Sequence, residues 1–148
     1  MNVEELLVFA KQYIHKDHAK ILLAELLQKN PLELLANLDL QVSKEQEEIF
    51  KNEIQAIMNG KPLQYVIGHV NFYGNSFDID NRVLIPRYET EELVEQTIEY
   101  INKYFTNPVD IIDLGCGSGV IGLTLEQKVS TKTVDLIDIS PKALEIAE

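Results

Sequence analysis

Cysteine is nearly absent from this chain, since only Cys116 among its 148 residues carries a thiol. No disulfide can form within the chain, and we therefore expect a protein of the reducing cytoplasm. Basic residues are also few: 13 Lys and Arg face 24 Asp and Glu, for a formal net charge of -11. Such an acidic surface repels phosphate backbones, so we expect no direct binding to nucleic acid.

Long apolar runs are missing too. No run approaches the roughly 20 residues that a membrane-spanning helix needs, so we expect no contact with a membrane. Residues 1–5 are too acidic for a secretory signal. The three histidines have no metal-ligand spacing, and we expect no metal site. Apolar residues still make up 45% of the chain, which is enough for a packed core.

Residues 3–58 have the apolar spacing of amphipathic helices. Leucine, isoleucine and aromatic side chains recur every three or four positions, which predicts a small helical bundle with a shared core. Asp17 is the expected N-cap of a helix over residues 19–27. Ser43 and Gln46 have the spacing of a capping box, which predicts where a further helix begins.

The pattern changes after this helical region. Residues 69–80 carry apolar and aromatic side chains on either side of Gly74 and Asn75, which predicts a short β-hairpin. Thr90 is the expected cap of a helix over residues 91–105, whose acidic first turn suits the helix dipole. A hairpin and a helix thus separate the helical bundle from the C-terminal part of the chain.

A strand–helix–strand order begins at residue 109. An apolar strand over residues 109–114 leads through glycines into a helix, and a second strand covers residues 133–139. Ser140 and Pro141 then begin another helix. Two strands are too few for a doubly wound sheet, so we expect a fragment of a longer α/β protein, with a small self-contained domain as the alternative.

The glycines after the first of these strands form a loop whose sequence over residues 113–119 is Asp-Leu-Gly-Cys-Gly-Ser-Gly. A strand, closely spaced glycines and a helix let backbone approach a ligand where side chains would collide, and the helix N-terminus attracts a carboxylate. Asp138 lies about 20 residues further on, at the position where a carboxylate binds ribose hydroxyls. We therefore expect a nucleoside cofactor.

Two registers of these glycines fit known patterns. Gly117 to Gly122 matches the dinucleotide pattern G-x-G-x-x-G of nicotinamide enzymes, but its first glycine lies late after the strand. The register that starts at Gly115 puts glycine at the strand end and Asp113 just before it. That register resembles the first motif of class I methyltransferases, Asp-x-Gly-x-Gly-x-Gly, and implies S-adenosylmethionine. We expect Gly122 to permit close helix–strand packing and Cys116 to be inert.

Three sequence segments upstream of the glycine loop indicate which family of class I methyltransferases the chain resembles. They are Gly-Lys-Pro-Leu-Gln-Tyr-Val-Ile-Gly at 60–68, Phe-Tyr-Gly at 72–74 and Val-Leu-Ile-Pro-Arg-Tyr-Glu-Thr-Glu at 83–91. Together with the helical N-terminus and the glycine loop, they closely resemble the PrmC/HemK family of peptide chain release factor glutamine methyltransferases. Where that family usually has a second proline in the third of these segments, this chain has Tyr88.

The resemblance implies three segments. Residues 1–67 would form a helical domain that helps to dock the substrate, residues 68–82 a hairpin linker, and residues 83–148 the first part of a class I, Rossmann-like methyltransferase domain. The resemblance implies that S-adenosylmethionine is held by Asp113, Gly115, Cys116, Gly117, Ser118, Gly119 and Asp138. The entrance for cofactor or substrate would be lined by Arg87, Glu89 and Thr90.

The implied activity is transfer of a methyl group to the side-chain amide nitrogen of the glutamine in the Gly-Gly-Gln motif of class 1 release factors. The family's catalytic Asn-Pro-Pro-Tyr motif has no counterpart before Glu148, so we expect no catalytic residue in this chain and an inactive fragment. Two alternatives stay open. One is a methyltransferase for nucleic acid or ribosomal proteins, and the other is a non-catalytic protein-binding module.

Overall fold

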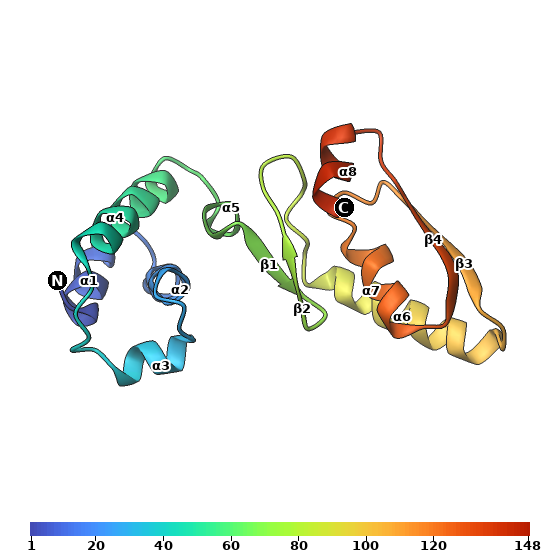
Figure 1. The fold of residues 1–148 in the computed structure, drawn as a ribbon, viewed down its shortest axis with the longest axis horizontal. Coiled ribbons are helices and arrows are strands. Elements are labelled where there is room, and N and C mark those ends of the chain that lie inside the picture. The colour runs from blue at the N-terminus through green and yellow to red at the C-terminus, as the bar shows by residue number, and fades with distance from the viewer. The chain divides into compact units, whose positions relative to one another are not determined.

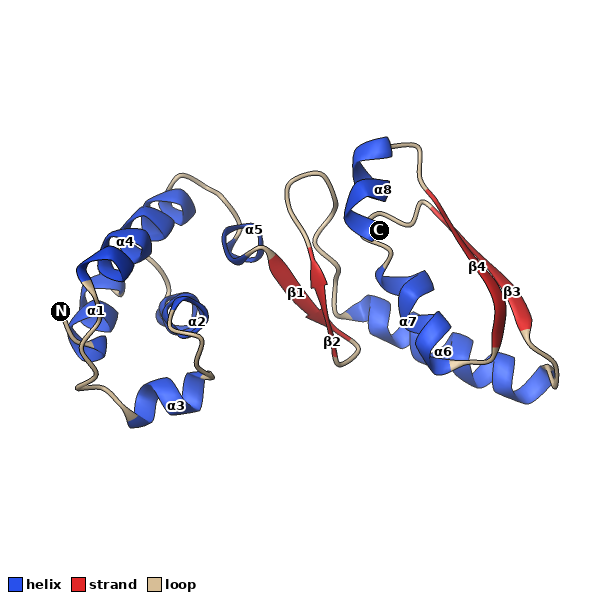
Figure 2. Cartoon of the chain, viewed as in Figure 1, coloured by secondary structure: helices blue, strands red, loops and turns tan.

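The computed structural model describes residues 1–148, which fall into two units, Met1–Ile67 and Gly68–Glu148 (Figure 1). Helices form the first unit, whereas the second combines helices with two small sheets (Figure 2). The expected mixed α/β class is therefore confirmed. None of the helices is both long and apolar enough to cross a membrane.

Five helices build the first unit, and their apolar stripes meet in one core. They are α1 (Val3–Ala10), α2 (Lys16–Leu26), α3 (Pro31–Ala36), α4 (Lys44–Met58) and α5 (Leu63–Ile67). α2 contacts each of the other four, so it occupies the centre of the unit. The largest fully buried side chains of this core include Leu22, Leu23 and Phe50, and each stabilises the fold by roughly 1.5–3 kcal/mol.

Side-chain caps determine where these helices begin. The expected capping box at α4 is confirmed, because Gln46 donates its N–H to Ser43 Oγ at 3.1 Å and Ser43 donates to Gln46 Oε1 at 3.3 Å. The expectation for α2 is wrong, because this helix begins at Lys16 and its cap is His15. Nδ1 of His15 accepts the N–H of Asp17 at 3.3 Å. Asp17 therefore lies inside the first turn, where its carboxylate faces the positive end of the helix dipole.

The second unit contains a hairpin and, after it, a strand–helix–strand arrangement. In chain order its elements are β1 (His69–Phe72), β2 (Asn75–Asp78), α6 (Glu89–Tyr104), β3 (Val109–Leu114), α7 (Val120–Lys128), β4 (Thr131–Ile137) and α8 (Pro141–Ala147). β1 and β2 pair antiparallel, whereas β3 and β4 pair parallel. α7 contacts both parallel strands and also α6, while α8 contacts β4. Because β3 and β4 are parallel, both end at the same edge of the sheet.

The turn of the hairpin lies one residue earlier than expected. It consists of Tyr73 and Gly74, and Asn75 already belongs to β2. Both turn residues have positive φ, 47° and 81°, as a two-residue type I′ turn requires. Tyr73 tolerates this conformation because Oε1 of Glu91 accepts its N–H at 2.8 Å and the ammonium of Lys128 lies 5.7 Å from its ring centroid. The turn is thus held by side chains from α6 and α7.

The start of α6 also differs from the expectation. The helix begins one residue before Thr90, so Thr90 lies in the first turn and is not the cap. Its N–H donates to the Arg87 carbonyl at 3.0 Å. The residue before the helix, Tyr88, already has helical backbone angles (φ -57°, ψ -38°), which leaves no extended residue from which a hydroxyl could cap the helix.

Candidate functional site

The glycine loop joins β3 to α7 at the carboxyl edge of the parallel strands. β4 ends at Ile137, two residues earlier than expected, because Ser140 caps α8 and turns the chain away from the sheet. The N–H groups of Gly115 and Cys116 both donate to the Ile137 carbonyl, at 2.7 and 3.0 Å. The loop therefore lies against the end of β4, directly beside Asp138.

The three glycines of the loop divide into two kinds. All have positive φ, which is +76° at Gly115, +56° at Gly117 and +74° at Gly119. A Cβ added to either of the first two would meet nothing within 4 Å. A Cβ on the third would meet three side chains at 3.1 to 3.2 Å, namely Leu123, Leu136 and Ala147. The first two glycines thus expose open backbone, whereas the third is packed against the domain.

Asp138 fixes this loop through its carboxylate. Oδ2 accepts the N–H of Gly117 and Oδ1 accepts the N–H of Ser140, each at 2.9 Å. These two hydrogen bonds, from Ser140 first and Gly117 second, lower the pKa of Asp138, while desolvation opposes them. Each carboxylate oxygen has two lone pairs, so one on each oxygen remains for a further donor. The arrangement can hold the loop and bind a pair of hydroxyl groups together.

Asp113 supports the other end of the loop. The N-cap of α7 is Gly119, which has no side chain to satisfy the first-turn N–H groups. Oδ2 of Asp113 accepts the N–H of Gly122 at 2.9 Å and supplies the missing acceptor from β3. A Cβ on Gly122 would lie 2.5 Å from Leu136 Cδ2 and 3.2 Å from Asp113 Cβ. The expectation that Gly122 permits close helix–strand packing is confirmed.

Cys116 and Ser118 are buried residues of the loop, with exposed fractions of only 8% and 5%. Burial raises the pKa of the Cys116 thiol, and the nearby carboxylates of Asp113 and Asp138 raise it further. A thiol with a raised pKa stays protonated at neutral pH and is a poor nucleophile. Cys116 therefore has a packing role in the loop.

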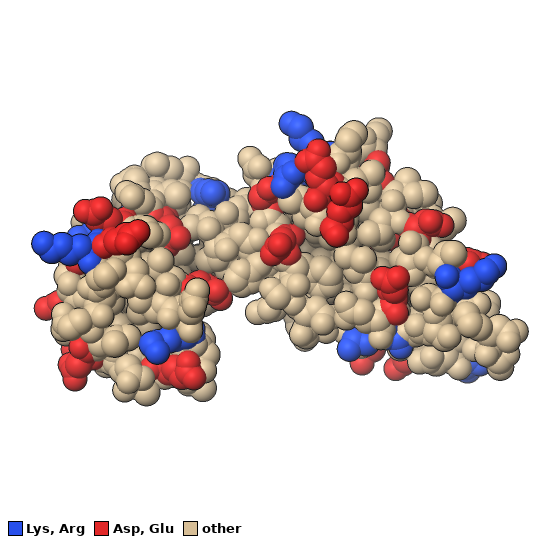
Figure 3. Space-filling model, viewed as in Figure 1, with Lys and Arg blue, Asp and Glu red and all other residues tan.

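The residues expected to line the entrance for cofactor or substrate lie outside the glycine loop and make no hydrogen bond to it. Arg87 and Glu89 are exposed, and Thr90 lies in the first turn of α6. No hydrogen bond or ion pair joins any of the three to the glycine loop. The face in Figure 3 carries scattered acidic and basic groups without an extended basic patch. No group of three or more His, Cys, Asp or Glu side chains is placed to hold a metal ion.

Arg82 is a linker residue that the sequence pattern did not single out. Its guanidinium contacts Asp80 in the same turn and Glu145 on α8, each with a shortest distance of 2.7 Å. The Asp80 contact results from a spacing of two residues, but Glu145 is 63 residues away, which no local signal reveals. The pair connects the linker to the helix that comes after Asp138.

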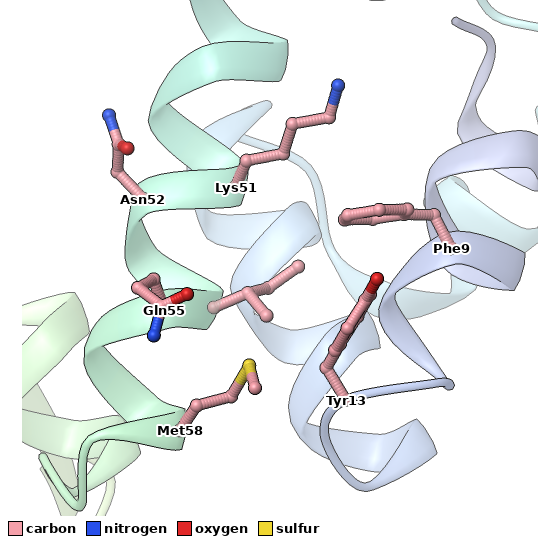
Figure 4. Close-up of a pocket in the computed structure, with 7 residues that line it drawn as sticks. Phe9, Tyr13, Lys51, Asn52, Gln55 and Met58 are labelled. Carbon is pink, nitrogen blue, oxygen red and sulfur yellow. The ribbon is translucent and has the colours of Figure 1, made fainter.

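A hollow of about 340 Å³ lies in the first unit between α1 and α4 (Figure 4). The rings of Phe9 and Tyr13 face Lys51 and Met58 across it. The Lys51 ammonium lies 5.5 Å from the Phe9 ring centroid and 2.6 Å from Oε1 of Glu47. The sequence alone does not distinguish Phe9, Tyr13 and Met58 from the buried apolar residues of the same helices. Whether an apolar side chain is exposed depends on which other helices pack against it.

Known proteins resemble both units of this chain. The model of the PrmC N-terminal domain matches residues 5–68, and that of the methyltransferase small domain matches residues 90–148, which include the glycine loop. A protein from Bacillus anthracis named release factor glutamine methyltransferase is 36% identical over the whole chain, which covers 54% of that relative.

A protein of the same name from Borreliella burgdorferi is also 36% identical, again over the whole chain and over 51% of the relative. This chain belongs to the PrmC/HemK family. The resemblance seen in the linker and the loop is thereby confirmed, and the second unit is methyltransferase-like. The chain spans about half the length of these PrmC/HemK relatives.

Proposed function

We propose that the glycine loop binds S-adenosylmethionine. The observation that carries this proposal is the open backbone of Gly115 and Gly117 beside the ionised carboxylate of Asp138. The two glycines would lie against the ligand, and the N-terminus of α7 would attract its carboxylate. Asp138 would accept two ribose hydroxyls with its remaining lone pairs. Asp113 would keep the loop in shape through Gly122 rather than contact the ligand.

The proposed reaction is methylation of the glutamine amide nitrogen in the Gly-Gly-Gln motif of class 1 release factors. Its support is the name that the relatives carry and the methyltransferase match over residues 90–148. When bound, S-adenosylmethionine supplies an electrophilic methyl group on a sulfonium. The amide nitrogen is a weak nucleophile because its lone pair is delocalised, so it must be held in line at about 3 Å. We assign the residues of this chain to binding, and we expect no transfer by the chain alone.

Docking of the release factor is proposed for the first unit. The hollow between α1 and α4 offers Tyr13 and Met58, which are 47% and 49% exposed. Exposed aromatic and methionine side chains at a concave site are typical anchors for a protein partner. The ammonium of Lys51 adds one polar contact at the rim. We place this interaction in the cytoplasm, where the single thiol of the chain would stay reduced.

Calorimetric titration with S-adenosylmethionine tests the cofactor. We expect one site per chain and at least tenfold weaker binding after Asp138→Ala, because the variant loses both the hydroxyl acceptor and the bond to Gly117. The matched control is Asp135→Ala, which removes an exposed carboxylate from β4, the strand that leads to Asp138, and should change the affinity less than twofold. Excess NADH should not compete. Wild-type chain without heat of binding, or equal losses in both variants, would contradict the proposal.

Methyl transfer is tested separately with labelled cofactor. A class 1 release factor is incubated with this chain and, in parallel, with the Bacillus anthracis relative. We expect the relative to label the Gly-Gly-Gln glutamine and the chain alone to leave it unlabelled. Label deposited by the chain would refute its inactivity, and an unlabelled release factor after incubation with the relative would refute the substrate.

A further inference from the structure

Three aromatic side chains at the C-terminal end of α6 lie on the surface. Tyr100, Tyr104 and Phe105 are 59%, 59% and 50% exposed. Their rings form a cluster, since the centroid of Tyr100 lies 4.8 Å from that of Tyr104 and 6.2 Å from that of Phe105. Clustered exposed aromatic rings mark surfaces that bind partners. We name these three residues, with Glu99 and Asp110, the Tyr100 patch.

Two hollows adjoin at this patch. One has a volume of about 440 Å³ and lies between the end of α6 and the start of β3, where Phe105, Pro108 and Asp110 line it. The other has a volume of about 240 Å³ and runs along α6 beside Glu99. Tyr100 lines both, so side chains of a partner can contact it from either hollow.

The charges around the patch favour a basic partner. Glu99 and Asp110 each line one of the hollows, and Oδ1 of Asp110 is held by the hydroxyl of Thr133 at 2.8 Å. Lys103 also lines the hollow beside Glu99, and its ammonium lies 5.1 Å from the ring centroid of Tyr104. The Tyr104 ring therefore already has a cation, and Tyr100 is the ring left for the partner. The two carboxylates outnumber the single ammonium of Lys103, which disfavours phosphate groups and anionic membranes. A guanidinium suits the patch best, because it stacks on a ring and donates to a carboxylate at once.

We propose that the Tyr100 patch docks an arginine-bearing segment of a protein partner. The guanidinium stacks on Tyr100 and pairs with Glu99 or Asp110, while a neighbouring apolar side chain enters the hollow beside Phe105. The patch lies at the start of β3 and the glycine loop at its end, about 17 Å away along the strand. A partner can therefore occupy the patch while the glycine loop remains open.

Two matched decapeptides test the proposal by nuclear magnetic resonance. They differ only in carrying three arginines or three lysines at the same positions. We expect the arginine peptide to shift amide signals of residues 96–111 and to leave residues 115–119 unchanged. The lysine peptide should bind at least fivefold more weakly, because an ammonium cannot stack as a planar group. Equal affinity of the two peptides, with shifts spread along all acidic residues, would refute a specific site.

Variants localise the effect. Tyr100→Ala/Tyr104→Ala should weaken binding of the arginine peptide at least tenfold, and circular dichroism checks that the fold is kept. Asp110→Asn, which retains an oxygen for Thr133, should weaken binding at least threefold without touching the aromatic cluster. The control Glu92→Gln/Glu95→Gln removes two charges from the same helix outside the patch and should change affinity less than twofold. Loss of binding in the control alone, or a dimer that disappears in the tyrosine variant, would overturn the proposal.

Discussion

Gly117→Ala and Gly119→Ala form a matched pair that separates the packing of the glycine loop from its contact with a ligand. Both glycines have positive φ, 56° and 74°, so alanine at either position costs about 1–2 kcal/mol of backbone strain. At Gly117 the new Cβ meets nothing within 4 Å, whereas at Gly119 it meets three side chains at 3.1 to 3.2 Å. Overpacking of this kind costs a further amount of about 1–3 kcal/mol. We expect unfolding free energies to fall by about 1–2 kcal/mol for Gly117→Ala and about 2–5 kcal/mol for Gly119→Ala.

Urea unfolding monitored by circular dichroism measures this difference. A gap of about 2 kcal/mol corresponds to a midpoint shift of about 1 M urea between the two variants. Cofactor binding should show the reverse order. Gly117→Ala places a methyl group in the open space and should weaken S-adenosylmethionine binding at least tenfold, while folded Gly119→Ala should retain more of the affinity.

Two results would refute this reasoning. If Gly117→Ala destabilised the chain as much as Gly119→Ala, the space beside Gly117 would not be open. If Gly117→Ala bound S-adenosylmethionine as well as the wild type does, the open backbone would not be the contact surface. The stability comparison does not depend on the identity of the cofactor, so it stands even where calorimetry detects no binding.

Two further predictions concern how substitutions of Gly122 and Asp138 change the free energy of unfolding. Gly122→Ala should lower the free energy of unfolding by up to about 2 kcal/mol, because overpacking against Leu136 costs about 1–3 kcal/mol and the gain in helix propensity offsets about 1 kcal/mol. Thermal unfolding measures this difference, and a stabilised variant would contradict it. The folded pKa of Asp138 is lowered, so its stabilising effect is present above the unfolded pKa near 3.9, and is lost as pH falls through the folded pKa. Asp138→Asn should therefore lower the free energy of unfolding at pH 7 and make it fall less steeply with pH below about pH 4. Urea unfolding from pH 7 to below about pH 4 measures this dependence. A steeper fall in the variant would count against the assigned hydrogen bonds.

Local sequence signals predicted the features that depend on neighbouring residues. The capping box of Ser43 and Gln46 works because donor and acceptor are three positions apart. The strand–glycine–helix order and the packing role of Gly122 were predictable from the short-range pattern around the loop. In each case the interacting residues lie within one helical turn or one strand–helix connection of each other.

Features that depend on distant partners could not be predicted from the sequence. Tyr73 occupies a left-handed turn position because Glu91, 18 residues away, accepts its N–H. The ion pair of Arg82 with Glu145 likewise joins segments that meet only in the folded unit. The cap of α2 was missed for a different reason, since His15 acts through an imidazole nitrogen at a position where oxygen-bearing side chains are more common. Tyr73 and His15 thus occupy a turn position and an N-cap position at which other residue types are more common.

The packing around Gly119 brings together residues from separate segments of the chain. Leu123, Leu136 and Ala147 fill the space that a side chain at this position would need. Alanine is already the smallest side chain available at 147 short of glycine, so a larger residue at 119 would require a smaller one at 123 or 136. Relatives should therefore vary at these four positions in a coordinated way. Substitutions at Ala147 in α8 would then accompany substitutions in the glycine loop rather than those on the exposed surface of the helix.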